Sequence, residues 1–285
     1  MKKLLWIGTL TLTLAACTPM MIAPETPKGT VLYGLTDNGK LAMLGSDNSE
    51  KSTTTRDISG LNGATLVDLD VRPSDGKLYA ISSDGKMFSI DPMTGAATAV
   101  TMPAEGVTLM PTSMDFNPAV DRTRVFAMND QNFRVNQTTN PYTPTVDGTL
   151  KYADTPEQNP DLAGAAYDNS YLNMGTPPVA IPEGEAATRL FSVDRSTGQL
   201  IKHETAAGST PAGNFSTLRP VGNLGIALGA NVGFDIGTMG GQMGTDTAYL
   251  VNGNMLYTVN LTTGMATLKG KTGVTLKSLA VKLTE

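Results

Sequence analysis

The feature that most constrains the fold of this chain is a six-residue stretch that occurs four times in related forms. It begins with an aliphatic residue followed by Asp or Asn, and it ends in Gly or Asn. The Asp or Asn side chain can accept a hydrogen bond from the backbone two residues further on, and the last position tolerates a positive φ. Each copy therefore predicts the end of a strand followed by a chain reversal. The copies lie at 90–95, 135–140, 193–198 and 259–264.

Short runs rich in β-forming residues lie ahead of these turns. The dipeptides Asn38-Gly39 and Asp84-Gly85 each join two such runs, and these are the strongest short-range signals for a tight hairpin. Each repeat is therefore predicted to be a meander of antiparallel hairpins. One aromatic residue recurs at the same place in the repeat and predicts packing between neighbouring repeats. These aromatic residues are Tyr33, Tyr79, Phe126, Phe191 and Tyr249.

A further strand introduces each repeat, and five such strands are predicted between residues 66 and 283. The steps between them are 46, 50, 68 and 47 residues, and a four-stranded propeller blade takes roughly 40–50 residues. The long step contains a proline-rich excursion at 171–187. The last introducing strand, 278–283, has no repeat after it, whereas the first repeat lacks one. We therefore expect an all-β propeller in which this C-terminal strand closes the ring by pairing with the first blade. Five blades are favoured; six blades, or a solenoid or sandwich of equal strand content, are the alternatives.

The first residues predict export. Lys2 and Lys3 precede an apolar stretch that leads into Leu-Ala-Ala-Cys at 14–17. As a helix this stretch would span only about 20 Å, against about 30 Å of hydrocarbon, so it is too short for a stable membrane anchor. We expect residues 1–16 to be a signal peptide. The sequence at 14–17 is typical of a bacterial lipobox, and an ordinary signal peptide is the alternative.

Cys17 is the only cysteine in the chain, and we expect it to be the lipidated first residue of the mature protein. Residues 17–28 are then a tether, and residues 29–285 a single propeller domain. Thr18 stands where Asp would favour retention in the inner membrane, so we expect the outer membrane or the cell surface. Removal of Lys2 and Lys3 changes the formal net charge from −5 to −7, which disfavours nucleic acid and anionic membrane surfaces as partners.

Two adjacent stretches, 114–125 and 131–136, resemble a bacterial family known as domain of unknown function 4394. The segments 69–80 and 229–236 are similar to other recurring stretches of that family, and the resemblance extends over nearly all of residues 30–283. It implies secreted or surface-anchored, β-propeller-like proteins. It implies no reaction and supplies no catalytic residue. The proline-rich segment at 172–187 departs from the family pattern.

The residue types present in the chain allow few kinds of catalytic site. His203 is the only histidine, and Cys17 is expected to carry lipid, so zinc sites built from His and Cys are excluded. A Ser-His-Asp triad would have to use His203. Because charged residues flank His203 in a predicted strand, we expect it to lie on the surface. No glycine-rich loop precedes a predicted helix, so a nucleotide phosphate site is not supported.

Carboxylates are the remaining candidates. Asp70, Asp115 and Asp235 lie in introducing strands, which line the central channel of a propeller. Asp70 and Asp115 could act as acid and base on a carbohydrate or a lactone, with or without Ca²⁺, and all three could bind that cation. The favoured interpretation is structural, with each carboxylate capping a turn or pairing with a neighbouring arginine.

Three arginines, together with Asp235, are candidate ligand contacts. Arg72, Arg122 and Arg124 could clamp an anionic ligand. The favoured alternative is a network of ion pairs between blades that uses Asp68 or Asp115.

The function expected from these observations is that of a lipid-anchored, non-catalytic propeller that presents a surface to another envelope component, a protein or a glycan. Tyr142, Tyr152 and Tyr171 lie in predicted loops and could stack on a sugar or peptide. The alternative is a hydrolase or lyase that uses Asp70 and Asp115. Carboxylates converging around an open pocket would favour the enzyme, and carboxylates bonded to backbone or arginine would favour the binding protein. No cofactor is expected, with Ca²⁺ as the alternative.

Overall fold

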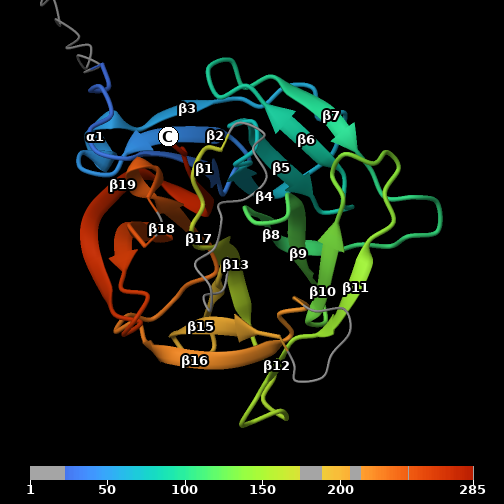
Figure 1. The fold of residues 1–285 in the computed structure, drawn as a ribbon. Coiled ribbons are helices and arrows are strands. Elements are labelled where there is room, and N and C mark those ends of the chain that lie inside the picture. Colours follow the sequence, from blue (N-terminus) through green and yellow to red (C-terminus); the bar gives the residue numbers. More distant parts are fainter. Residues whose placement is uncertain (1–22, 174–187, 206–212, 243, 285) are drawn as a thin grey trace, which may run out of the picture.

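The computed structural model describes residues 23–173, 188–205, 213–242 and 244–284. The described chain is all-β with a β-propeller arrangement, as expected (Figure 1). Its helical elements are α1 (Ser49–Ser52) and the short 3-10 turn η1 (Met239–Gly241). Within the described ranges, no helix is long and apolar enough to cross a membrane. The predicted signal peptide, Cys17 and most of the proline-rich excursion lie outside these ranges.

The strands form four hydrogen-bonded sheets. The first two are antiparallel meanders of four strands. Their members are β4 (Leu66–Val71), β5 (Leu78–Ser82), β6 (Met87–Ile90) and β7 (Ala97–Thr101), then β8 (Pro111–Asn117), β9 (Arg122–Ala127), β10 (Gln131–Val135) and β11 (Thr145–Thr149). The third sheet adds one short strand, which pairs in parallel with the outermost strand of its meander. It comprises β13 (Leu162–Tyr167), β14 (Leu190–Asp194), β15 (Gln199–Glu204), β16 (Thr217–Asn223) and β12 (Lys151–Tyr152).

The fourth sheet joins the two ends of the domain. Its order is β17-β18-β19-β1-β2-β3. The long strand β19 pairs with β18 along its first part and with β1 along its last part, where Leu32 lies opposite Val281 and Leu35 opposite Ser278. Because β19 pairs with strands from both ends of the chain, the described residues form four sheets where the repeats predict five separate ones. The strands are β17 (Val232–Thr238), β18 (Asp246–Val259), β19 (Ala266–Val281), β1 (Val31–Thr36), β2 (Leu41–Gly45) and β3 (Thr54–Arg56).

The predicted turns are confirmed at three of the four copies; at 135–140 the Asn136 side chain accepts from the Thr138 amide only at 3.3 Å, and Asn140 does not have a positive φ. At the end of β6, the Asp91 carboxylate accepts a hydrogen bond from the Met93 amide at 2.7 Å, and Gly95 has a φ of +77°. The same bond forms from the Ser196 amide to Asp194 and from the Thr262 amide to Asn260. A side-chain oxygen thus fixes each reversal, which is why the hexamer recurs.

The core lies between neighbouring sheets. The recurring aromatic residues are all buried, as predicted. The cluster between the β1–β3 strands and the β4–β7 sheet joins Leu35 and Leu41 to Leu69 and Leu78, and each such side chain contributes about 1.5–3 kcal/mol when it is withdrawn from water. The sheets therefore adhere through apolar faces.

Tyr142 lies in the connection between β10 and β11, as predicted, whereas Tyr152 lies in β12; the prediction that either is available to a ligand is wrong. Both are buried. The Tyr142 hydroxyl donates to the Gly85 carbonyl at 2.6 Å, and the Tyr152 hydroxyl donates to Asp194 at 2.5 Å. Each phenol finds its acceptor on a neighbouring turn or strand, so its ring is held in the core. Tyr171 is only half-buried.

Candidate functional site

Three carboxylates meet where the inner strands of the sheets converge. Asp70 on β4, Asp115 on β8 and Asp235 on β17 each offer an oxygen atom within 4.8 Å of the others. All three are buried, with 5%, 3% and 4% of the residue surface exposed, respectively. They meet because their strands pack side by side with two others. β8 contacts β4 and β13, and β17 contacts β13 and β19. β19 in turn contacts β4. We call Asp70, Asp115 and Asp235 the central carboxylates.

Each central carboxylate accepts a hydrogen bond from a backbone amide of the next inner strand. Asp70 accepts from Phe116 N at 2.8 Å, and Asp115 accepts from Tyr167 N at 3.1 Å. Asp235 accepts from Val281 N at 2.5 Å. These side chains take the place of the carbonyl oxygens that another strand would supply, so they link one sheet to the next and satisfy buried amides.

Asp68 extends the same pattern. Its carboxylate accepts from Met114 N at 2.8 Å and from the Ser278 hydroxyl at 2.5 Å, so it contacts the strands on both sides of β4. At the contact between β13 and β17 the backbones themselves approach closely. A Cβ atom on Gly164 would lie 2.7 Å from the Cβ of Phe234, so only glycine fits there.

Burial governs the ionisation of this group. It raises the pKa of Asp68 and of Asp70 to about 7, although backbone hydrogen bonds lower the pKa of both. Burial and the charges of the neighbouring aspartates raise the pKa of Asp115 and Asp235 well above the usual range. Like charges this close cannot all be ionised without compensation. Chemically, the central carboxylates can share protons or hold a cation.

Arg72 lies in an ion-pair network between two sheets. Its guanidinium donates to Asp121 at 2.8 and 2.5 Å and to Asp75 at 3.0 Å, which joins the turn after β4 to the turn after β8. Burial raises the pKa of Asp121, but its pairing with Arg72 brings that pKa below the ordinary value. The acids are Asp75 and Asp121, and the predicted Asp68 and Asp115 are not among its partners. Arg122 is exposed and donates to the Asp121 carbonyl at 2.9 Å.

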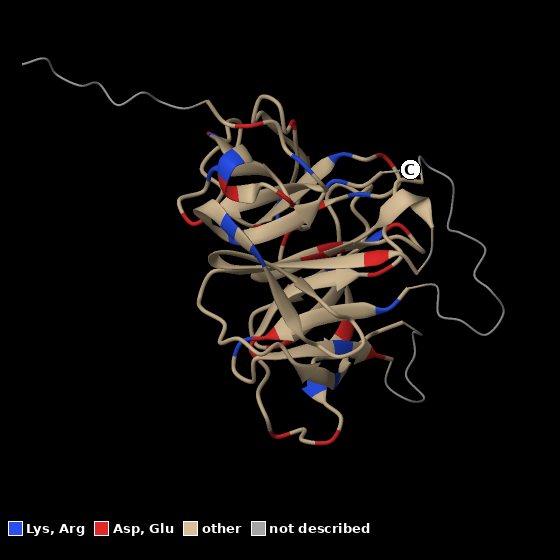
Figure 2. Ribbon diagram, turned by 90° about the vertical axis from the view of Figure 1, so that its left-hand side faces the viewer, with Lys and Arg blue, Asp and Glu red and all other residues tan. Residues whose placement is uncertain are grey.

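Arg124 is buried within a different network. It is 1% exposed, and its guanidinium donates to Asp147 at 2.5 Å and to Asn132 at 2.8 Å. It also donates to the Tyr167 hydroxyl at 3.0 Å and to the Gly213 carbonyl at 2.9 Å. This geometry suits a cross-link between the third and second sheets better than a clamp for a ligand. Figure 2 shows acidic and basic residues close together in several places on the sheets.

The expectation that His203 lies on the surface is wrong. It is 1% exposed on β15, with its ring stacked on Phe126 of the neighbouring sheet at 5.0 Å. Its Nε2 lies 2.8 Å from the Ser192 hydroxyl, and its Nδ1 lies 3.2 Å from the Phe215 carbonyl. Burial lowers the pKa of His203 to about 3, so the ring is neutral at physiological pH. The Ser192–His203 pair thus belongs to the packing between two sheets.

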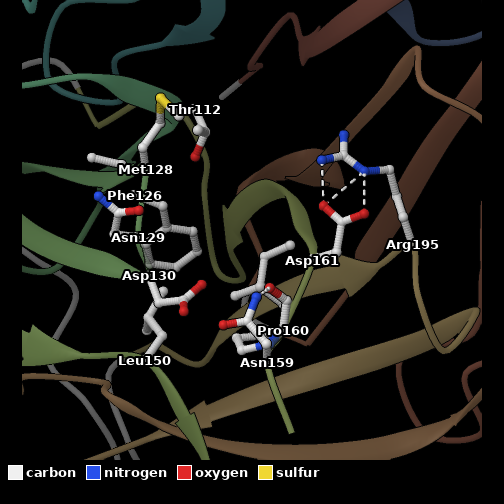
Figure 3. Close-up of a pocket in the computed structure, with 12 residues that line it drawn as sticks. Thr112, Phe126, Met128, Asn129, Asp130, Leu150, Asn159, Pro160, Asp161 and Arg195 are labelled. Carbon is white, nitrogen blue, oxygen red and sulfur yellow. Dashed lines mark hydrogen bonds and ion pairs between the residues drawn. The ribbon is translucent and has the colours of Figure 1, made fainter.

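A pocket of about 260 Å³ opens between the β8–β11 sheet and the β13–β16 sheet (Figure 3). One wall is the turn that contains Asp130, and the other is the segment at 159–162 together with Arg195. Phe126, Leu150 and Leu162 add apolar surface. None of the sequence-predicted site residues lines this pocket. The sequence does not predict this pocket, because segments from separate repeats form it; only Arg195 belongs to the recurring hexamer, at 193–198, and that motif specifies a turn.

A sequence model of the family described as domain of unknown function 4394 matches residues 40–280. No curated protein matches the chain.

Two solved structures are among those similar to this chain. A chain from a crystal structure of a nidogen/laminin complex is 11% identical, with a TM-score of 0.46 over 90% of this chain and 99% of that one. A structural-genomics protein of unknown function from Bacteroides thetaiotaomicron VPI-5482 is 14% identical, with a TM-score of 0.48 over 84% of this chain. This chain spans 55% of that second protein.

Proposed function

The chain belongs to the family of domain of unknown function 4394, and from that premise we propose that it is a lipid-anchored, non-catalytic propeller. Its role is to present a rigid surface to another component of the cell envelope, a protein or a glycan. The family name carries no reaction, so the proposal depends on the geometry of the central carboxylates and of the surface around them.

The burial and bonding of the central carboxylates carry the proposal. Asp70, Asp115 and Asp235 are close enough together for acid–base chemistry. However, all three are buried, and each holds a backbone amide of the next inner strand. A general acid or base must reach the proton of a bound substrate. Because these carboxylates join neighbouring sheets, they support a structural role over a catalytic one.

The proposal includes five blades in a closed ring. In this interpretation the six-stranded sheet counts as two blades that share β19. The first part of β19 completes the blade of β17 and β18, and its last part is the inner strand of the blade of β1, β2 and β3. The contacts of β19 with both β17 and β4 support this arrangement. A ring closed in this way removes open sheet edges.

The second candidate is a calcium site at the central carboxylates, serving either structure or a carbohydrate-acting enzyme. Three carboxylate oxygens within 4.8 Å favour it. Ca²⁺ takes about six to eight oxygen ligands, and here several carboxylate oxygens already accept amide hydrogens. We therefore favour shared protons.

Anchoring through Cys17 gives a direct prediction. In the native host, the wild-type protein is expected to sediment with membranes and to incorporate labelled fatty acid, because several acyl chains make attachment durable. The Cys17→Ala variant is expected to lose both the label and most of the membrane association. Thr18→Ala, which leaves the thiol in place, is the matched control. Equal membrane association of Cys17→Ala and wild type would contradict lipid anchoring.

The binding role is tested by cross-linking the full-length protein in intact cells and identifying what it captures. A reproducible envelope protein or glycan is expected. In parallel, purified protein is incubated with envelope polysaccharides and a panel of lactones. Product that forms with wild type and is lost in Asp115→Asn would overturn the non-catalytic assignment.

A further inference from the structure

We propose that the pocket between the β8–β11 and β13–β16 sheets binds a hydroxyl-rich, non-anionic ligand about the size of one sugar ring, such as the terminal residue of a glycan. The inference rests on the proposed binding function and names its ligand class. It is carried by the side chains that line the pocket (Figure 3).

The walls of the pocket are held in place before any ligand arrives. On one side, Asn129 and Asp130 form the tight turn between β9 and β10, with φ values of +60° and +59°. The Leu150 amide donates to the Asp130 carbonyl at 2.8 Å and fixes that turn. On the other side, Arg195 donates to Asp161 through Nη2 at 2.5 Å and through its backbone amide at 2.9 Å. A preformed site loses less entropy on binding.

The polar groups at the pocket offer both acceptors and donors. Among the described residues, no hydrogen bond or ion pair engages the Asp130 carboxylate, which extends into the space between the walls (Figure 3). Burial raises the pKa of Asp130. Within the described part of the chain, the Asn159 side-chain amide donates only to the Pro160 carbonyl, at a long 3.4 Å, and Thr112 adds a hydroxyl. Hydroxyl groups both donate and accept, so a polyol matches this mixed set.

The charges at the pocket disfavour an anionic ligand. Asp161 neutralises the Arg195 guanidinium at one wall, so the Asp130 carboxylate, which has no partner among the described residues, is the net charge at the pocket, and it repels an anion. Apolar surface from Leu150, Leu162 and Pro160 suits the C–H face of a sugar ring. The volume of about 260 Å³ is below the roughly 300–1,000 Å³ of sites for drug-sized ligands, so a single ring fits better than a longer chain.

The test compares ligands of one shape and different charge. Full-length protein is titrated with the methyl glycosides of glucose, galactose, mannose and N-acetylglucosamine, and with glucuronic acid and glucosamine. Binding is followed by saturation-transfer NMR and calorimetry. The pocket variants are Asp130→Asn, which tolerates the positive φ, and Asn159→Ala. Glu105→Gln, an exposed acid outside the pocket, is the matched control, and melting temperatures check that all variants fold.

We expect at least one neutral glycoside to bind, with affinity about tenfold or more weaker in Asp130→Asn because a charged acceptor is lost. Affinity in Glu105→Gln should be unchanged. The proposal is overturned if no neutral glycoside binds, if the anionic glucuronic acid binds more tightly than the neutral glycosides, or if both pocket variants bind like wild type. If an envelope partner is still captured in any of those cases, the proposed binding function stands and only the pocket assignment fails.

Discussion

Replacing Arg124 with methionine is expected to lower the free energy of unfolding by about 3–5 kcal/mol. Methionine fills a similar volume but cannot donate hydrogen bonds. The buried Asp147 carboxylate would keep only Arg134, and Asn132, the Tyr167 hydroxyl and the Gly213 carbonyl would each lose a donor. Removing a partner from a buried charge lowers the free energy of unfolding by more than the intact pair adds to it.

Urea unfolding of Arg124→Met and Arg134→Met measures this effect. Both arginines pair with Asp147, but the Arg134 side chain is 25% exposed and that of Arg124 only 1%. Arg134→Met should therefore lower the free energy of unfolding clearly less than Arg124→Met does. Equal losses in the two variants, or a loss below about 0.5 kcal/mol in Arg124→Met, would show that this network does not hold the two sheets together.

Replacing Asp115 with asparagine is expected to stabilise the protein at pH 8 relative to wild type, and much less so at pH 5. Asparagine keeps an oxygen that can accept from Tyr167 N and removes a charge from the central carboxylates. Burial and the neighbouring aspartates raise the pKa of Asp115 above its unfolded value. The folded state then binds the proton more tightly, so the contribution of Asp115 is greatest at low pH and is lost as pH rises through the folded pKa.

The measurement is the difference in melting temperature between Asp115→Asn and wild type across pH 5–8, after treatment with chelator. Each unit of pKa elevation corresponds to about 1.4 kcal/mol, and a gain of about 1 kcal/mol shifts the melting temperature by about 2–4 °C in a domain of this size. Burial lowers the pKa of His203, so this residue changes stability with pH in the opposite direction. It titrates in both proteins, so its effect cancels in the difference between their melting temperatures. If added Ca²⁺ raises the melting temperature of wild type and not of Asp115→Asn, the central carboxylates hold a cation and shared protonation is wrong.

The repeat in the sequence predicts the strands well because each turn is specified locally. Asp91, Asp194 and Asn260 fix their own reversals, so no distant contact is needed. The convergence of Asp70, Asp115 and Asp235 also follows from the sequence, since equivalent positions of introducing strands face a common axis.

Features that depend on distant partners could not be predicted in the same way. The four-sheet pairing depends on β19 continuing through Gly270 and Gly273, where the local sequence favours a turn. Asp147 lies in a strand of mostly exposed residues, and only the approach of Arg124 makes its burial possible. The surface prediction for His203 is wrong because its charged neighbours, Lys202 and Glu204, face the opposite side of the strand. The alternation of side chains along a strand is the sequence signal that indicates burial of His203.

Aspartate side chains bonded to backbone amides join the inner strands of neighbouring sheets. Native-state hydrogen exchange at the amides of Phe116, Tyr167 and Val281 tests this claim most directly, because their acceptors are Asp70, Asp115 and Asp235. These amides should exchange only through global unfolding. Exchange as fast as that of the exposed turn at Gly39 would contradict the claim.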